Sequence, residues 1–495
     1  MAPLVWGAVA AGAAPREPAV AGRFYPAEPE RLKAAVRAYL DEAVAPRAEP
    51  PVALILPHAG YIFSGQIAAD GWRQAQAGSY DVIVILGTNH TTAGFGGVAI
   101  HPGPAFRTPL GLAQVDARLA AELIEADPAF VANTAVHERE HSVEVHVPFA
   151  QVAFPAVPIL PAVVGRPDPE LCARFGRALA KAVAGRRALI VASSDLSHYP
   201  GYDDARVSDG AVLAAIAGLD TQAVRRAIAG ELRKGRPGLD TCACGEAPVL
   251  AAIEAAKALG ATRGVVLSYA NSGDAVVGDR SRVVGYGAVA LTRGPAGVDV
   301  AALGPRNAAT SGTELSASDK KTLLALARQS IAQYLASGTA PLPRETSAAL
   351  DRRQGVFVTL RKHGELRGCI GHMAEDLPLQ LATGRMALAA AFEDARFPPL
   401  EAAELGDVDV EVSVLTPAER VAGPEAIRIG EHGVVLNKDG RRAVFLPEVA
   451  VEQGWDRTTL LEHLCAKAGL PKDAWKQGAE FAVFRSIHFR ESDRL

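Results

Sequence analysis

Three histidines each follow a short apolar run, and these are the residues in the chain best placed to do chemistry. They are His58 after Val52 to Leu56, His90 after Val82 to Leu86, and His198 after Ala188 to Ala192. Apolar runs of this length bounded by breakers are typical of interior strands of a parallel sheet. Open α/β sheets bind ligands beyond the carboxyl ends of such strands. The repeated pattern predicts three imidazoles at one rim, and we expect the active centre there.

Cys244 is the residue that would make this rim a metal site. It stands at the start of a predicted helix in LDTCACGEAPVLAAIEAAKAL, where backbone amides and the helix dipole stabilise a thiolate. If His58, His90 and Cys244 converge, two neutral imidazoles and a thiolate form a three-ligand site with an open position, as catalytic metals require. These ligands favour iron(II), copper or zinc over magnesium or calcium.

Other polar residues near the rim could move protons or support the ligands. Asp195 and His198 lie three residues apart after one strand and could act as an orienting carboxylate and a general base. His141 and Glu144 are spaced i, i+3 on a predicted helix and could supply supporting hydrogen bonds.

A structural explanation competes with each assignment. A loop histidine is usually a surface or hydrogen-bonded residue, and either cysteine of the C-x-C pair, Cys242 or Cys244, is more often a small buried hydrophobe. The cluster from His137 to His146 could be a solvated helix face. The pattern of strand followed by histidine, repeated three times, favours a metal or catalytic site.

Alternating strands and helices must position these residues, and they predict a doubly wound α/β sheet. The expected helices include one from Pro29 to about Ala43, one capped by Ser64, one from Asp116 to Ala126 and one from Pro169 to Ala184. We expect residues 1–17 to be a disordered tail, 18–293 the first domain, 294–318 a linker rich in Gly, Pro, Ala and Ser, and 319–495 a second domain.

The second domain has α+β character and one candidate site, Cys369. GVFVTLRKHGELRGCIG predicts a hairpin that turns at Lys362 to Glu365. Glycines near Cys369 would give access to the thiol, and the guanidinium of Arg367 could lower its pKa. A core cysteine in a hairpin explains these facts equally well.

Composition excludes several classes of protein. The 495 residues predict two or three domains, and 49% hydrophobic with 21% charged residues is typical of soluble globular proteins. A net charge of -4 gives no indication of a basic surface that would bind nucleic acid. No apolar run reaches the length of a membrane span. Five cysteines favour a reducing compartment, and the opening MAPLVWGAVAAGAAP lacks a basic segment. We expect a cytoplasmic protein.

Six motifs between Ala21 and Leu291 resemble the Memo family, known in bacteria as AmmeMemoRadiSam system protein B. They are AGRFYP, LPHAGYIFSG, LGTNHT, EHSVEVHVPF, SSDLSHY and CGEAPV. The family fold is similar to that of extradiol ring-cleavage dioxygenases, which hold Fe(II) with two histidines and a glutamate. By motif, His58 and His90 match the histidine ligands, Cys244 stands where the carboxylate would be, and His198 stands at the position of the base.

The thiolate changes the charge and redox behaviour of the site, so the resemblance does not imply ring-cleavage activity for this chain. The resemblance implies iron or copper binding and a redox or oxidase role on an unidentified small-molecule or peptide substrate. Two alternatives stay open: a binding module that recognises a peptide or partner without turnover, and a zinc-dependent hydrolase.

The second domain resembles the AMMECR domain, AmmeMemoRadiSam system protein A. The resemblance rests on FVTL, LRGCIG, AAFEDARFPPL, VEVSVL and FLPEVAVEQGWD, between about Asp319 and Phe489, and implies an α+β fold in two subdomains with a cleft near Cys369. The system's name implies a radical S-adenosylmethionine partner. Because this chain has no C-x3-C-x2-C run, that partner would be a separate polypeptide.

Overall fold

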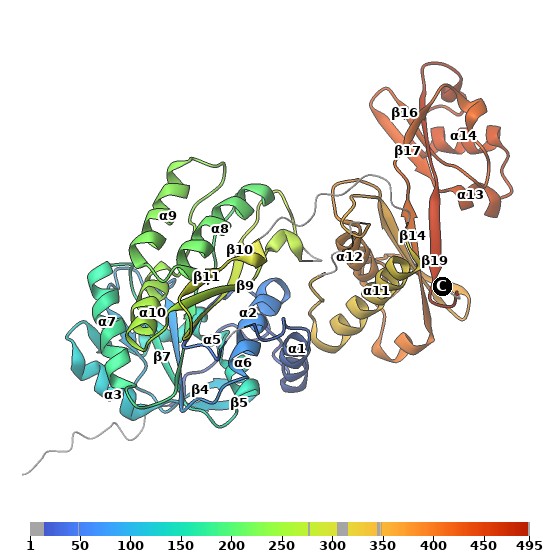
Figure 1. Cartoon of the computed structure of the whole chain (residues 1–495). Coiled ribbons are helices and arrows are strands. Elements are labelled where there is room, and N and C mark those ends of the chain that lie inside the picture. Colours follow the sequence, from blue (N-terminus) through green and yellow to red (C-terminus); the bar gives the residue numbers. More distant parts are fainter. Residues whose placement is uncertain are drawn as a thin grey trace, which may run out of the picture. The chain divides into compact units, whose positions relative to one another are not determined.

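The computed structural model describes residues 14–47, 49–275, 278–303, 315–343, 347 and 349–493. The chain forms two compact units, one of Met1–Pro305 with Ala336–Leu342 and the other of Arg306–Leu335 with Pro343–Leu495 (Figure 1). Residues 1–13 of the predicted tail lie outside the described residues. Arg16, also in that stretch, is 5% exposed and hydrogen-bonded, so this residue is part of the folded domain.

The described part of the first unit contains one nine-stranded sheet, in the order β11-β9-β10-β1-β8-β2-β7-β3-β6. The strands are β1 (Ala53–Leu56), β2 (Val82–Thr88), β3 (Val98–Ile100), β6 (Phe130–Ala132), β7 (Ile159–Val164), β8 (Ala188–Ser193), β9 (Arg263–Asn271), β10 (Gly285–Thr292) and β11 (Gly297–Asp299). The four central strands β1, β8, β2 and β7 are parallel. β10 and β3 flank them in the antiparallel direction. The α/β prediction is confirmed, with mixed strand directions toward the edges.

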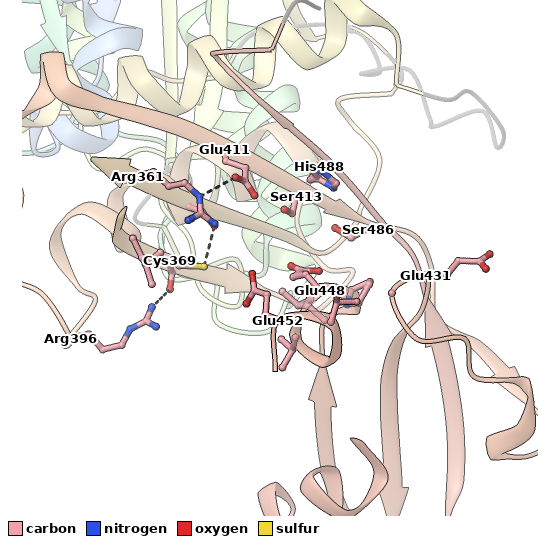
Figure 2. Close-up of a pocket in the computed structure, with 17 residues that line it drawn as sticks. Arg361, Cys369, Arg396, Glu411, Ser413, Glu431, Glu448, Glu452, Ser486 and His488 are labelled. Carbon is pink, nitrogen blue, oxygen red and sulfur yellow. Dashed lines mark hydrogen bonds and ion pairs between the residues drawn. The ribbon is translucent and has the colours of Figure 1, made fainter. Parts of the chain in front are cut away.

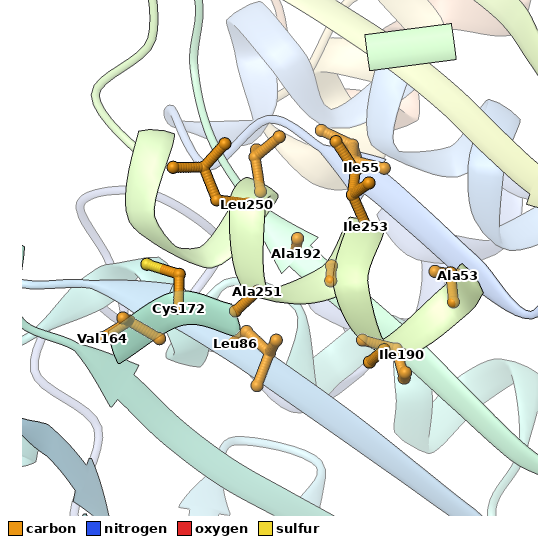
Figure 3. Packing of buried hydrophobic residues seen from close by; sticks show 14 of the residues in the cluster. Ala53, Ile55, Leu86, Val164, Cys172, Ile190, Ala192, Leu250, Ala251 and Ile253 are labelled. Carbon is orange, nitrogen blue, oxygen red and sulfur yellow. The ribbon is translucent and has the colours of Figure 1, made fainter. Parts of the chain in front are cut away.

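Alternate side chains of each central strand point to opposite faces of this sheet. Both faces are apolar, and helices cover both of them. Ile55 packs into a core built with α3 (Ala117–Ala126), α7 (Pro169–Ala182), α8 (Tyr202–Ala217), α9 (Thr221–Arg233) and α10 (Glu246–Ala258), part of which Figure 3 shows. Leu54 faces the other core, with α1 (Pro29–Asp41), α2 (Tyr61–Ala75) and α6 (Val147–Ala153). Burial on both faces explains why these strands read as continuous apolar runs.

Two local predictions need correction. The helix expected to be capped by Ser64 begins at Tyr61 with Gly60 as its N-cap, and the Ser64 hydroxyl donates to the Ala59 carbonyl at 2.9 Å. The predicted linker contains the edge strand β11, which pairs with β9. Remaining elements of this unit are the hairpin of β4 (Ala105–Thr108) and β5 (Gly111–Gln114) and the short helices α4 (Ala135–Glu138) and α5 (His141–Glu144).

The second unit has the expected α+β fold, with two four-stranded sheets among its described residues. The first contains β13 (Glu365–His372), β12 (Val356–Lys362), β14 (Val408–Leu415) and β19 (Ser486–Arg490), and α12 (Leu379–Phe392) packs on it. The second contains β15 (Glu419–Val421), β18 (Glu480–Phe484), β16 (Gly433–Lys438) and β17 (Arg441–Phe445). Further helices are α11 (Ala317–Ser337), α13 (Pro447–Glu452) and α14 (Arg457–Lys467).

The predicted hairpin of β12 and β13 is present. It turns at His363 and Gly364, whose φ angles are 53° and 87°, as a two-residue primed turn requires. Within the described ranges, no helix combines the length and apolar character needed to cross a membrane.

Candidate metal centre

The carboxyl ends of β1 and β2 deliver the two predicted histidine ligands to one place. β8 lies between β1 and β2 and is parallel to both, so the loops that carry His58 and His90 leave the same edge of the sheet. One donor atom from each of His58, His90 and Cys244 lies within 4.8 Å of the other two. Cys244 Sγ is 3.1 Å from His58 Nε2.

Ser193, the last residue of β8, fixes the orientation of His58. Its hydroxyl donates its one proton to the Ser142 carbonyl at 2.6 Å. It must therefore accept from His58 Nδ1 at 2.7 Å and from His146 Nε2 at 3.1 Å. The proton of His58 is then on Nδ1, and the Nε2 lone pair faces Cys244. Burial lowers the pKa of His58 well below its usual value, and neighbouring histidines lower it further.

Glu140 orients His90 in the same way. Its Oε1 accepts from His90 Nδ1 at 3.0 Å and its Oε2 accepts from the His90 amide at 2.7 Å. Nε2 of His90 then carries no proton, and its lone pair can bind a metal. Metal-binding histidines commonly have this arrangement, with the other ring nitrogen donating to a carboxylate. The sequence analysis did not identify Glu140 or Ser193 as residues that orient the ligands. Two features of the sequence could have indicated them: Glu140 is a carboxylate directly before a helical turn, and Ser193 is a hydroxyl at the end of a strand that a histidine follows.

Cys244 reaches the centre because the next residue, Gly245, packs against the β8 loop. A Cβ at Gly245 would lie 2.2 Å from the Ser193 carbonyl oxygen and 2.6 Å from Ser194 Cβ, so only glycine allows this approach. Burial raises the pKa of the Cys244 thiol, with the Asp195 carboxylate adding to the effect. Two imidazole lone pairs and one sulfur fit iron, copper or zinc, and binding would release the thiol proton.

His141 lies beside the proposed ligands. Its ring stacks on that of His90 with centroids 4.7 Å apart, and its centroid is 5.3 Å from that of His58. Phe24 meets the same ring edge-on at 4.8 Å. Burial lowers the pKa of His141 to about 4. Together with His90 and Glu140, it forms a second group with donor atoms close enough to hold an ion.

Asp195 supports His58 rather than His198. Its Oδ1 accepts from the His58 amide at 2.7 Å, and burial raises its pKa to about 7 against the effect of that amide. His198 lies near enough for its charge to lower the pKa of His58. Within the described chain, Nε2 of His198 is buried and has no hydrogen-bond partner. Burial also lowers the pKa of His198.

Glu144 does not contact the proposed ligands, contrary to the supporting role expected for it. Its carboxylate forms an ion pair with Arg16 and accepts from the amides of Ala19 and Val20 and from the Tyr25 hydroxyl. These bonds tie residues 16–25 to α5. Phe24 belongs to that segment, so Glu144 acts on the site by positioning the segment that packs on His141.

In the second unit, Cys369 lines a cleft, but the arginine expected to activate it points elsewhere. A β-bulge between Leu360 and Arg361 makes Arg367 the unpaired residue, and its guanidinium binds Glu404 at 2.9 Å. Burial raises the pKa of the Cys369 thiol, which contradicts the predicted lowering. Gly368 also serves packing rather than access, because its Cβ would lie 2.1 Å from the Ala390 carbonyl oxygen.

Comparisons with known proteins agree with this division of the chain. The sequence profile of the Memo-like protein family matches residues 16–290, and that of AMMECR1 matches residues 324–489. A MEMO1 family protein of Methanopyrus kandleri is 34% identical over 291 residues, which are 56% of this chain and 99% of the relative. Protein MK0488 of the same organism is 41% identical over 192 residues, 37% of this chain and 93% of its own.

Among solved structures, the uncharacterized protein PH0010 of Pyrococcus horikoshii is 38% identical and covers 34% of this chain and 90% of its own, with a TM-score of 0.32. The Memo-like match covers more than half of the chain, and the order of the two profile matches is the order of the two units. The chain therefore belongs to the Memo family and carries an AMMECR1 domain in the same polypeptide.

Proposed function

We propose that the Memo domain is a non-haem metal redox protein of the dioxygenase-like type, with iron or copper held by His58, His90 and Cys244. The observation that supports this proposal is that one donor atom from each of His58, His90 and Cys244 lies within 4.8 Å of the other two, while Ser193 and Glu140 hold the two imidazoles at Nδ1. When bound, iron or copper supplies a redox couple and a Lewis acid. The His90 side chain is 29% exposed, so substrate can reach this side of the centre.

His198 is the residue we propose as the proton carrier. Its Nε2 is buried and has no partner among the described residues, so it is available to a substrate atom. His141 forms the neighbouring wall through its stacked contact with His90. Ser193, Glu140 and Asp195 hold the ligands in position through the hydrogen bonds to His58 and His90.

We further propose that the protein works with a separate radical S-adenosylmethionine protein on a small-molecule or peptide substrate. The pairing of Memo and AMMECR1 domains supports this proposal, because both resemble components of a system named for such a partner. All five cysteines are free, which supports placing the protein in the cytoplasm.

Elemental analysis of protein purified without oxygen tests the metal assignment. We expect near-stoichiometric iron or copper in the wild type and loss of the metal in Cys244→Ser and His58→Ala. His198→Gln should retain the metal, because His198 is not assigned as a ligand. Stoichiometric zinc would instead favour hydrolysis. Metal content unchanged in both ligand variants would contradict the site, and metal-free protein that still binds a partner would favour a binding module.

A further inference from the structure

A cleft of about 680 Å³ lies within the AMMECR1 domain, between the open face of the first sheet and the start of α13 (Figure 2). Cys369, Thr359 and Glu411 are cross-strand neighbours in the sheet, in register from β13 through β12 to β14. All three line the cleft, whereas Gly368 faces α12 on the opposite side. The cleft therefore has a polar floor that the packing of α12 leaves uncovered.

Two hydroxyls in this floor lack hydrogen-bond partners. Ser413 is 5% exposed, and its side chain makes no hydrogen bond with any residue that the structure describes. The buried Ser486 Oγ on β19 also has no partner within the described ranges. Both residues line the cleft. Because buried polar groups nearly always have partners, the Ser486 hydroxyl points to a ligand with hydrogen-bonding groups, and the unpartnered Ser413 hydroxyl in the same lining can bond to that ligand.

Among the charged residues that the structure describes around the cleft, two carboxylates have no ion-pair partner. Arg361 pairs with Glu411 at 3.4 Å and Arg396 with Asp394 at 2.7 Å. Glu431 pairs with Arg428 and Arg485.

Glu448 and Glu452 remain, one helical turn apart on α13, so both project from the same side of the helix. Neither forms an ion pair with the described residues. Burial raises the pKa of Glu448, and the charges of Glu452 and Glu411 raise it further, while His488 on β19 acts in the opposite direction. A cation at this wall would relieve that repulsion.

Apolar side chains complete the cleft beside these carboxylates. Leu366 is 38% exposed and Val451 is 60% exposed, and both line the cleft. Large apolar side chains open to solvent next to uncompensated charge match a ligand that is charged at one end and apolar along its body.

We propose that this cleft binds an organic cation, an ammonium or guanidinium group carried on an apolar body. Glu448 and Glu452 hold the charge, Leu366 and Val451 contact the body, and Ser413 and Ser486 supply hydrogen bonds at the floor. Cys369 lies in the same floor, with its sulfur accepting from the Thr359 hydroxyl at 3.2 Å, so a bound ligand shields the thiol. The proposal is independent of the metal centre.

Protection of Cys369 from iodoacetamide tests the proposal on the full-length protein. The probes are hexylammonium, hexanoate and 1-hexanol at equal concentration and ionic strength, and peptide mass spectrometry follows each cysteine separately. We expect hexylammonium to slow alkylation of Cys369 about fivefold at about four times its Kd, by mass action. Hexanoate should give no protection, and hexanol should protect less than hexylammonium does. Cys465 is fully buried, so its alkylation reports loss of the fold.

The double variant Glu448→Gln/Glu452→Gln should lose the protection by hexylammonium, measured as the ratio of rates with and without the probe in each protein. Glu425→Gln, an exposed glutamate that does not line the cleft, should behave as the wild type. Equal protection by hexanoate, protection retained in the double variant, or no protection by hexylammonium would each overturn the proposal.

Discussion

Glu140 holds His90 through both of its carboxylate oxygens, one on the ring Nδ1 at 3.0 Å and the other on the backbone amide at 2.7 Å. A third bond, from the Ser142 amide at 2.8 Å, fixes the carboxylate itself. Burial would raise the pKa of Glu140, but hydrogen bonds and the proximity of His90 outweigh it and lower the pKa to about 2. The ring and its loop are therefore held at one carboxylate.

Replacing this carboxylate should weaken metal binding without removing a ligand. In Glu140→Gln the amide can still meet one of the His90 donors, but the ring loses its charged support. Loss of such a partner typically lowers metal affinity about 10- to 100-fold. Competition with a chromophoric chelator measures the change.

Glu138 offers a matched control, because it is exposed and two residues away. Glu138→Gln should leave the affinity at the wild-type value. Equal affinities for Glu140→Gln and Glu138→Gln would show that the orientation of His90 does not depend on this carboxylate.

Ser193→Ala should affect both stability and metal binding. The change removes the acceptor for His58 Nδ1 and His146 Nε2 and the donor to the Ser142 carbonyl. Leaving buried polar groups unsatisfied costs about 1–3 kcal/mol each. Nothing then holds the proton of His58 on Nδ1, so metal affinity should fall as well.

Urea unfolding and chelator competition measure these two effects. Ser281→Ala removes an exposed hydroxyl whose bond is to Asp279 and should change neither value. A stable Ser193→Ala protein with wild-type affinity would rule out the proton assignment for His58.

The sequence predicted the rim of the site because its cause is local. An apolar strand followed by a polar loop places His58, His90 and His198 at the carboxyl edge wherever the sheet is parallel. The hydrogen bonds that orient the ligands join residues far apart in the chain, with 135 positions separating Ser193 from His58 and 50 separating Glu140 from His90. Such pairs depend on how strands and helices pack, which local patterns do not encode.

Glu144 and Arg367 are the two residues whose side-chain directions were predicted wrongly, in both cases because local spacing does not determine what a side chain contacts. Glu144 has helical spacing from His141, but a single turn of helix directs its carboxylate to Arg16 instead. Arg367 is next but one to Cys369 in sequence, and regular alternation would place both side chains on one face. The bulge at Leu360 and Arg361 breaks that alternation.

Acid should destabilise the Memo domain before it reaches the range in which most carboxylates titrate. Burial lowers the pKa of His101 to about 4 and those of His137 and His146 to about 3. The unfolded chain binds these protons near pH 6.5, so the stability is complete above that pH and is lost as the pH falls toward 4.

His58, His141 and His198 act in the same direction. Asp195 and Asp209, with pKa values raised to about 7 by burial, and Glu246, whose pKa burial also raises, oppose it. The six histidines outnumber the three carboxyl groups, which leaves a net uptake of about three protons on unfolding, or about 4 kcal/mol per pH unit near pH 5. Urea unfolding followed by pulsed hydrogen exchange at β1 and β2 measures this slope.

His137→Gln should make the slope shallower by about one proton, because it removes one of the buried imidazoles that protonate on unfolding. His363→Asn replaces an exposed turn residue with positive φ and should leave the slope unchanged. A slope that does not differ among the three proteins would mean that His137 is protonated in the folded state.

Gly368→Ala should destabilise the AMMECR1 domain, because no side chain fits between β13 and α12 at this position. A Cβ at Gly368 would lie 2.1 Å from the Ala390 carbonyl oxygen. That atom belongs to the backbone of a buried helix, so it cannot move aside as a flexible side chain would. Overpacking of this kind costs about 1–3 kcal/mol, and hydrogen exchange at β12 and β13 should accelerate.

The comparison is Gly406→Ala, where a Cβ has no neighbour within 4 Å and the residue is exposed. This variant should match the wild type in the same exchange measurement. Because Cys369 is next to Gly368 and faces the cleft, any shift of β13 in Gly368→Ala should also alter the alkylation rate of Cys369. Wild-type exchange at both strands in Gly368→Ala would mean that α12 can separate from the sheet at little cost, and that the cleft floor is not held rigid by that helix.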